Sequence, residues 1–301
     1  MVAVYLLGAS SCCVSLPKAT PKARGSLRVP SGEHRVQESS AVWRDERRTR
    51  DIPVHIYSPA DVEGRVPVVI FSHGIGESRD SYVYIGRALA ANGFMSVHLT
   101  HAGTDKTVLD RGYWKLYQAT KDPENWRNRP LDVSFAIDEL SKRSDVDMSR
   151  IAVAGHSAGA FTAFAVAGVR APTGEGGADP RVRAIVAMSM PKIPGLNYED
   201  IRVPALNITG TCDSSIIYRT RPKDRRVPFE QTRATHQYLI TIEGVNHDVF
   251  SNAEDVHHDI VVRLTIAFLR AWMFDDRDAR AWFEDAGAAS VGPERVVLEV
   301  K

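Results

Sequence analysis

Short runs of apolar residues alternate along most of the chain with segments whose apolar residues recur at helical spacing. Residues 66–72 and 94–100 are two such runs, and residues 82–89 between them have the helical spacing. Strands that are buried on both faces are typical of parallel sheets. Further runs lie at residues 151–154, 184–188, 205–209 and 238–242, and helical patterns start at Pro130, surround Phe161 and cover residues 256–271. This rhythm predicts an α/β fold with a mainly parallel central sheet and helices on both faces.

The two ends of the chain depart from this rhythm. Residues 42–43 and 52–57 are β-like runs around a charged turn, which predicts an antiparallel hairpin at a sheet edge. Residues 1–40, which are rich in Pro, Lys, Arg, Ser and Gly from residue 15, are predicted to form a flexible leader. The α/β domain is therefore expected at residues 41–286, followed by a C-terminal tail at residues 287–301.

The composition excludes several classes of partner. The chain has 301 residues, of which 44% are hydrophobic, which is enough for one sizeable core. With 38 basic and 37 acidic residues the net charge is +1, so we expect a small-molecule substrate and no nucleic-acid partner. No apolar run reaches the length of a transmembrane segment.

The first residues permit two interpretations. Residues 2–9 form a brief apolar segment before Ser10, Ser11 and Cys12, which is typical of the end of an export signal or of a lipoprotein cleavage site. The segment is short and lacks a basic start, so a cytoplasmic protein with a frayed terminus is the alternative. The oligomeric state is left open.

The cysteines indicate neither a disulfide framework nor a metal site. Cys12 and Cys13 lie in the predicted leader, and Cys212 stands alone in the domain. We interpret Cys212 as a buried packing residue, and no disulfide, zinc site or cofactor is predicted.

The strongest chemical signal is a Gly-X-Ser-X-Gly motif at residues 155–159. It follows an apolar run and leads directly into a helical pattern, the context of a nucleophile on a sharp turn between a strand and a helix. Gly155 and Gly159 remove side chains where the turn brings strand and helix together. Ser157 is therefore the candidate nucleophile.

A serine nucleophile requires a base and a carboxylate that orients the base. Asp213 comes directly after the predicted strand at residues 205–209, and His247 comes directly after the one at residues 238–242. This chain order, Ser then Asp then His, is the one expected for the fold. Asp213 and His247 are therefore the candidate acid and base.

Other histidines and acids are less well placed. His257 and His258 fall within the last predicted helix, and neither Asp224 nor Asp248 ends a strand. His156 belongs to the motif itself, and its side chain is expected to point away from the pocket.

Acyl transfer also requires donors for the developing oxyanion. The backbone N–H of Ala158, directly after the nucleophile, is the first candidate. The second is the N–H of Ile75, because the glycines of residues 73–76 let the loop after an earlier strand fold tightly.

Two segments interrupt the α/β rhythm. Residues 102–129 follow the carboxyl end of a strand and contain Trp114, Tyr117 and Trp126, which we interpret as a wall of the substrate pocket. Equally, these aromatic residues could pack a small core within the insertion. Residues 219–235 are rich in Arg and Lys, and we interpret them as a solvated loop, with a clamp for an anionic substrate as the alternative.

Together these motifs resemble the dienelactone-hydrolase-like esterases, a group similar to platelet-activating-factor acetylhydrolase and, more distantly, to the cutinase-like polyester hydrolases. The resemblance covers roughly residues 42–282, and it rests on the motifs at residues 72–76, 78–80, 89–94, 129–133, 155–159 and 244–247.

The resemblance implies an α/β-hydrolase fold, a Ser157-Asp213-His247 triad, an oxyanion hole from Ile75 and Ala158, and ester hydrolysis without cofactor or metal. Dienelactone hydrolase itself uses a cysteine as nucleophile, so its substrate is not carried over. Ala158 replaces a larger residue common in the group, which enlarges the expected acyl pocket.

The sequence thus predicts a serine hydrolase that cleaves carboxylic esters through an acyl-enzyme on Ser157, with a small-molecule ester or a lipid-like molecule as substrate. An amidase, thioesterase or acyltransferase would use the same triad. A catalytically silent binding protein on the same fold is the remaining alternative.

Overall fold

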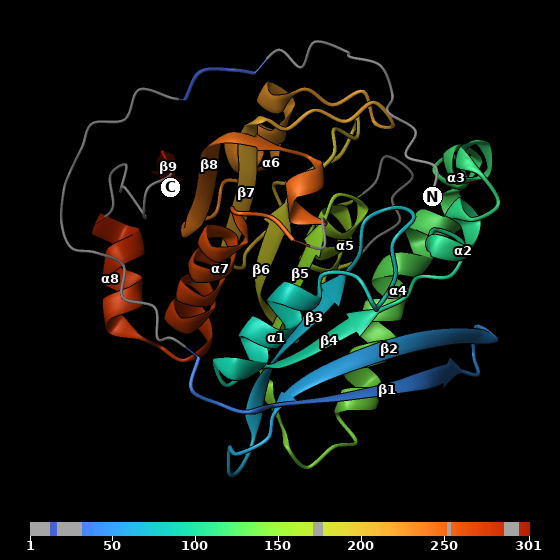
Figure 1. The fold of residues 1–301 in the computed structure, drawn as a ribbon, viewed down its shortest axis with the longest axis vertical. Helices are drawn as coiled ribbons and strands as arrows, with labels where there is room; N and C mark the ends of the chain where they lie inside the picture. The colour runs from blue at the N-terminus through green and yellow to red at the C-terminus, as the bar shows by residue number, and fades with distance from the viewer. Residues whose placement is uncertain (1–12, 17–31, 171–176, 252–253, 286–294) are drawn as a thin grey trace.

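A single mixed sheet forms the centre of the protein (Figure 1). The computed structural model describes residues 13–16, 32–170, 177–251, 254–285 and 295–301. Within them the sheet has nine strands in the order β1-β2-β4-β3-β5-β6-β7-β8-β9. The strands are β1 Val36–Asp45, β2 Arg50–Pro59, β3 Val66–Ser72, β4 Met95–Leu99, β5 Val146–His156, β6 Val182–Met188, β7 Ala205–Cys212, β8 Gln237–Asn246 and β9 Val296–Val300.

The six strands from β4 to β8 pair in parallel, and antiparallel strands flank them on both sides. Every residue of β3 and of β4 is buried, as the continuous apolar runs predict. The hairpin of β1 and β2 lies at one edge of the sheet, as expected.

Helices cover both faces of the sheet (Figure 1). On one face α1 Val83–Ala91, α7 His258–Met273 and α8 Arg277–Asp285 pack into a single apolar cluster with the strands. On the other face α4 Pro123–Leu140 and α5 Ala158–Val166 form a second cluster. The α/β-hydrolase type of fold is therefore confirmed.

The remaining helices are short and lie in the segments that interrupt the α/β rhythm. They are α2 Lys106–Leu109, α3 Tyr113–Ala119, α6 Val227–Gln231, and the 3₁₀ turns η1 Pro222–Arg226 and η2 Asp248–Phe250. None of the helices in the described residues is long and apolar enough to cross a membrane.

Both chain ends differ from the sequence prediction. β1 begins at Val36, inside the segment predicted to be leader, because it pairs with β2 as far as Pro59. Residues 296–300, predicted to be tail, form β9 and pair antiparallel with β8, which places their apolar side chains against the core. The predicted export segment lies outside the described residues.

The helix that was expected to start at Pro130 begins seven residues earlier. The Asp122 side chain accepts the N–H of Glu124 and caps α4, and Pro123 occupies its first position. Pro130 therefore lies inside the helix. The insertion at residues 102–129 is consequently largely helical, with α2, α3 and the start of α4.

The cysteine prediction is wrong. Cys13 and Cys212 form a disulfide, and the N–H of Val14 donates to the carbonyl oxygen of Thr211 at 2.9 Å. The two cysteines are 199 residues apart in the sequence, so only the folded chain brings them together. The bond attaches residues 13–16 to the chain directly beside Asp213.

Candidate active site

Ser157 stands on a strained turn between β5 and α5. Its φ of 54° and ψ of −116° lie in a region that non-glycine residues rarely adopt. A Cβ on Gly159 would overlap the carbonyl oxygen of Ser72, and one on Gly155 would overlap the backbone of Gly159. Both glycines are therefore required for the close approach that was predicted from the motif.

Ser157, His247 and Asp213 form a continuous chain of hydrogen-bonding contacts. His247 Nε2 lies 3.2 Å from Ser157 Oγ, and His247 Nδ1 lies 3.0 Å from Asp213 Oδ1. Ser157 and Asp213 are buried, whereas the His247 side chain keeps 17% of its surface exposed. The fold thus brings together three residues that are up to 90 positions apart in the sequence.

The Asp213 carboxylate is held from several sides. Oδ2 accepts the hydroxyl groups of Thr209, at 2.8 Å, and of Ser189. Burial alone would raise the pKa of Asp213, but the Arg225 guanidinium, His247 and the Ser189 hydroxyl together hold it well below its usual range. Asp213 is therefore ionised at neutral pH.

Arg225 is a member of this site that the sequence analysis missed. It is fully buried, and its guanidinium lies 2.8 Å from Asp213 Oδ1. It also donates to the carbonyl oxygens of Ser189, Met190 and Asp213 at 2.7–3.2 Å. Arg225 thereby joins the loops that follow β6 and β7.

Arg225 also competes for the imidazole. Its Nη2 lies 3.0 Å from His247 Nδ1, the atom that faces Asp213. A neutral imidazole can donate Nδ1–H to Asp213 or accept an N–H from Arg225, but not both. Only the tautomer that donates Nδ1–H to Asp213 leaves Nε2 unprotonated and able to take a proton from Ser157. Activation of Ser157 therefore requires that His247 Nδ1 bonds to Asp213 rather than to Arg225.

Arg225→Met is expected to lower kcat for an ester substrate about tenfold to a hundredfold, because the loop that carries Asp213 loses its anchors. Arg225→Lys should restore part of kcat. An unchanged kcat in Arg225→Met would show that Arg225 has no influence on the triad.

The loop at residues 73–76 lies beside the nucleophile, as expected. A Cβ on Gly74 would lie 3.6 Å from the Ser157 Cβ, and the Gly74 N–H donates to the hydroxyl of Tyr82. Among the described residues, the backbone N–H groups of Ile75 and Ala158 have no hydrogen-bond acceptor. Both N–H groups are thus available as hydrogen-bond donors.

The His156 ring packs against the ring of His247. His156 Nδ1 shares a hydrogen bond of 2.9 Å with the Tyr82 hydroxyl, and its ring centroid lies 4.7 Å from that of His247. The His156 side chain is buried, and it is not among the residues that line the pocket described below.

A buried polar network supports the loop at residues 73–76 from behind. Arg129 donates to the carbonyl oxygen of His73 and, at 3.1 Å, to Ser72 Oγ. The Ser72 hydroxyl in turn donates to His101 Nε2, and His101 Nδ1–H donates to Asp132, each at 2.9 Å. Burial lowers the pKa of Arg129 only to about 10, so its charge persists at neutral pH.

The buried histidines make the fold sensitive to acid. Burial lowers the pKa of His98 to about 3 and of His101 to about 4, and it also lowers the pKa values of His73 and His156. As the pH falls below about 6.5, protons bind first to these histidines in the unfolded chain. The folded protein is therefore not destabilised by these histidines above about pH 6.5, and its free energy of unfolding decreases as the pH falls below that value.

We expect the free energy of unfolding to fall between pH 7 and pH 5, by about 1.4 kcal/mol per pH unit for each buried histidine at most. Urea titrations at several pH values measure this slope, and His98→Gln should reduce it. Equal stability at pH 7 and pH 5 would contradict the assignment of neutral buried histidines.

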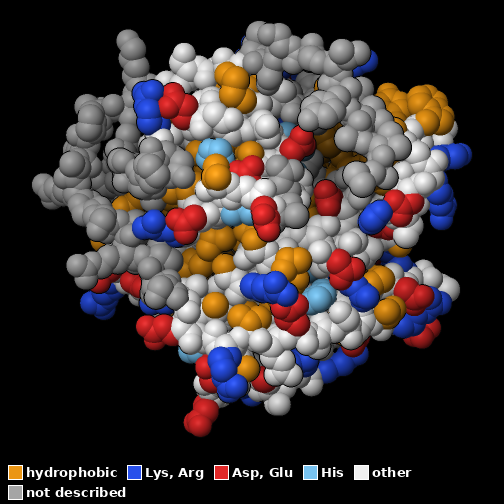
Figure 2. Space-filling view, viewed as in Figure 1, with side chains coloured by type: hydrophobic (Ala, Val, Ile, Leu, Met, Phe, Trp, Pro, Cys, Tyr) orange, Lys and Arg blue, Asp and Glu red, His pale blue; other side chains and the backbone are white. Residues whose placement is uncertain are grey.

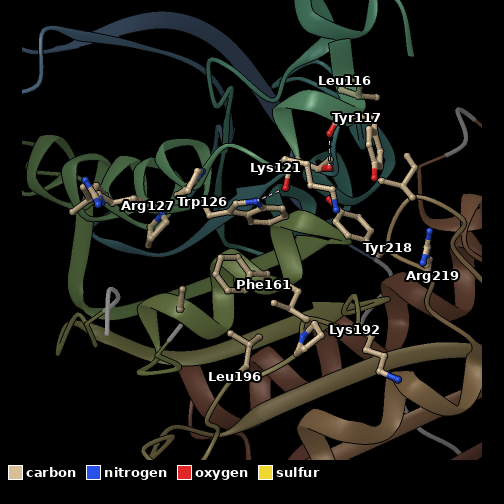
Figure 3. A pocket seen from close by; sticks show the side chains of 18 of the residues that line it. Leu116, Tyr117, Lys121, Trp126, Arg127, Phe161, Lys192, Leu196, Tyr218 and Arg219 are labelled. Atoms are coloured by element: carbon tan, nitrogen blue, oxygen red, sulfur yellow. Dashed lines mark hydrogen bonds between the residues drawn. The ribbon is translucent and has the colours of Figure 1, made fainter. Parts of the chain in front are cut away.

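A large pocket of about 1260 Å³ lies between α3, α4, α5 and the loops after β6 and β7. Figure 3 shows Trp126, Phe161 and Tyr218 turned toward one another across it. Tyr117 and Trp126 line the pocket, but Trp114 does not: it is 67% exposed and stacks on Tyr117. Trp114 is thus the one predicted pocket residue that the structure places outside the wall.

The walls of the pocket come from the elements that carry the triad. Phe161 lies one helical turn after Ser157, and its N–H donates to the Ser157 carbonyl oxygen. Leu116 contacts the loop at residues 73–76, since its side chain lies 3.2 Å from where a Gly76 Cβ would be. Residues 216–219 follow Asp213. The pocket is therefore built by segments that neighbour Ser157 and Asp213 in the chain, while Ser157, Asp213 and His247 are not among its lining residues.

The described residues contain no group of three or more His, Cys, Asp or Glu side chains that could hold a metal ion.

Comparison with known proteins agrees with this geometry. A family model described as PET hydrolase-like matches residues 19–285, most of the chain. The chain belongs to this family. This match agrees with the part of the sequence-based resemblance that pointed to cutinase-like polyester hydrolases.

Three relatives of this chain are distant in sequence. Cutinase 2 of Thermobifida cellulosilytica is 24% identical over 227 residues, which are 75% of this chain and 74% of that one. Cutinase cut1 of Thermobifida fusca is also 24% identical, and the match spans 61% of its length. The bifunctional acetylxylan esterase/xylanase XynS20E of Neocallimastix patriciarum is 25% identical over 180 residues, 58% of this chain and 23% of that protein.

Proposed function

We propose that this PET hydrolase-like protein hydrolyses carboxylic esters through an acyl-enzyme on Ser157. The observation that supports this best is the unbroken chain from Ser157 Oγ through His247 to the ionised Asp213. The names of the relatives, cutinases and an acetylxylan esterase, agree with the proposal. A closer relationship to the dienelactone-hydrolase-like esterases and platelet-activating-factor acetylhydrolase is part of the same proposal.

In the proposed reaction His247 Nε2 removes the proton of Ser157 as Oγ attacks the ester carbonyl carbon. The N–H groups of Ile75 and Ala158 stabilise the tetrahedral oxyanion. Asp213 holds the imidazole and stabilises the imidazolium, which then gives its proton to the leaving alcohol. Water, deprotonated by His247, releases the acid and restores Ser157.

The test is a panel of p-nitrophenyl esters, the corresponding p-nitroanilides and thioesters, measured on the wild type and on Ser157→Ala. We expect ester hydrolysis that depends on Ser157 and is faster than amide or thioester cleavage. Ester turnover that persists in a folded Ser157→Ala variant would overturn the proposal. Faster cleavage of the amides or thioesters would assign the triad to one of those reactions instead.

A further inference from the structure

The large pocket has an apolar mouth. Five of the ten large hydrophobic side chains exposed in the described residues line it. They are Tyr113, Tyr117, Leu131, Ile216 and Ile217. Figure 2 shows hydrophobic side chains gathered over α3. Exposed apolar groups that are concentrated in this way indicate a ligand that covers them.

The charged residues that line the pocket in the described part of the chain are all basic. The described residues that line it include Lys121, Arg127, Lys192 and Arg219, but no aspartate or glutamate. The whole chain has 38 basic and 37 acidic residues. A general excess of basic residues therefore does not explain why those at the pocket are all basic. The mouth therefore suits a ligand that is apolar along its length and negatively charged at its outer end.

Arg219 is the best placed of these cations. Lys192 pairs with Asp224 at 3.3 Å, Arg127 pairs with Glu124 at 2.7 Å, and Lys121 lies over the ring of Tyr117. Arg219 has no carboxylate partner among the described residues. Its charge is thus available to a ligand.

The loop that carries Arg219 is held in a defined conformation. Ser215 and Thr220 exchange two backbone hydrogen bonds of 2.9 Å, and the N–H of Arg219 donates to the carbonyl oxygen of Ile216. Arg219 has a φ of 49°, a left-handed conformation that is unfavourable for an arginine. Strain of this kind is common where a side chain has to be presented at a binding site.

The same loop also contributes Tyr218 to the pocket. The hydroxyl of Tyr218 is buried and has no partner among the described residues, while its ring lines the pocket beside Trp126. The ring of Tyr218, and not its covered hydroxyl, is therefore the part that faces a ligand in the pocket.

We propose that this pocket binds the acyl part of the substrate, and that this acyl part is an apolar chain ending in a carboxylate, which pairs with Arg219. The inference rests on the proposed esterase function and specifies its substrate class: half-esters of hydrophobic dicarboxylic acids.

The test compares pairs of p-nitrophenyl esters with the same chain and a neutral or a charged end: butanoate with succinate, octanoate with suberate, and dodecanoate with dodecanedioate. At one chain length or more, we expect kcat/KM of the wild type to be about fivefold higher for the charged ester. High salt should reduce the ratio of kcat/KM for the charged ester to kcat/KM for the neutral ester, because salt screens an exposed ion pair. Arg219→Glu should lower the ratio about tenfold, and Arg219→Gln should give an intermediate value.

Arg263→Glu is the matched control, because it makes the same charge change on α7, which covers the opposite face of the sheet. Its ratio should equal that of the wild type. If the neutral esters are hydrolysed but no chain length favours the charged ester, or if Arg219→Glu and Arg263→Glu give the same ratio, this inference fails while the esterase function stands. If none of the esters is hydrolysed, both fail.

Discussion

His247→Ala is expected to lower kcat for a p-nitrophenyl ester by on the order of a millionfold, the loss found when a triad acts as one unit. His247 Nε2 lies 3.2 Å from Ser157 Oγ, and no other described histidine contacts that oxygen. Without the imidazole, the serine proton has no acceptor, and a hydroxyl is a poor nucleophile at neutral pH. Steady-state kinetics on purified protein measures the loss.

The matched control for this variant is His257→Ala. His257 lies ten residues further along the chain, and its ring contacts Asp255 rather than the triad. Its kcat should stay within twofold of the wild type. A His247→Ala variant that folds normally and retains more than about one hundredth of kcat would contradict the role of His247 as the base.

Asp213→Asn is expected to lower kcat about ten-thousandfold, because an amide cannot hold the imidazole in the productive tautomer. It should also lower the free energy of unfolding by about 3–5 kcal/mol, because it leaves the buried guanidinium of Arg225 without its counter-charge. Enzyme kinetics and urea unfolding measure the two losses separately.

The double variant Asp213→Asn/Arg225→Met separates these two effects. Removing both charges should restore much of the lost stability, since no unpaired buried charge remains, whereas kcat should stay low. If the two single-variant losses of stability simply add in the double variant, Asp213 and Arg225 are not coupled, and the ion pair at 2.8 Å has no energetic significance.

The features that the sequence predicts correctly are those set by local pattern. Strands buried on both faces leave continuous apolar runs, such as the one that forms β3. Ser157 is recognisable because only glycine fits at positions 155 and 159 of its turn. Asp213 and His247 could be selected because the loops at the carboxyl ends of parallel strands meet at one edge of the sheet.

The features that the sequence analysis missed depend on contacts between distant segments. Arg225 is buried while its neighbours Arg221 and Lys223 remain exposed, and nothing in the basic run at residues 219–235 distinguishes them. The disulfide joins residues 199 positions apart. By contrast, residues 296–300 carry a detectable signal for β9, since four of the five are Val or Leu.

The insertion at residues 102–129 borders the cavity, but only two of the three aromatic residues predicted for the pocket line it. Tyr117 and Trp126 occur on successive helices that both face the cavity. Trp114 lies on the same short helix as Tyr117 but on its outer surface. The sequence locates the insertion but does not fix which side of a seven-residue helix faces inward.

The central claim is that Ser157 is an activated nucleophile. The most direct measurement is the intact mass of the purified protein after treatment with a fluorophosphonate, followed by peptide mapping. We predict one adduct per chain on Ser157, absent in His247→Ala and present in His257→Ala. A well-folded protein that forms no adduct, or forms one on another residue, would contradict the assignment and leave a binding protein on this fold as the better explanation.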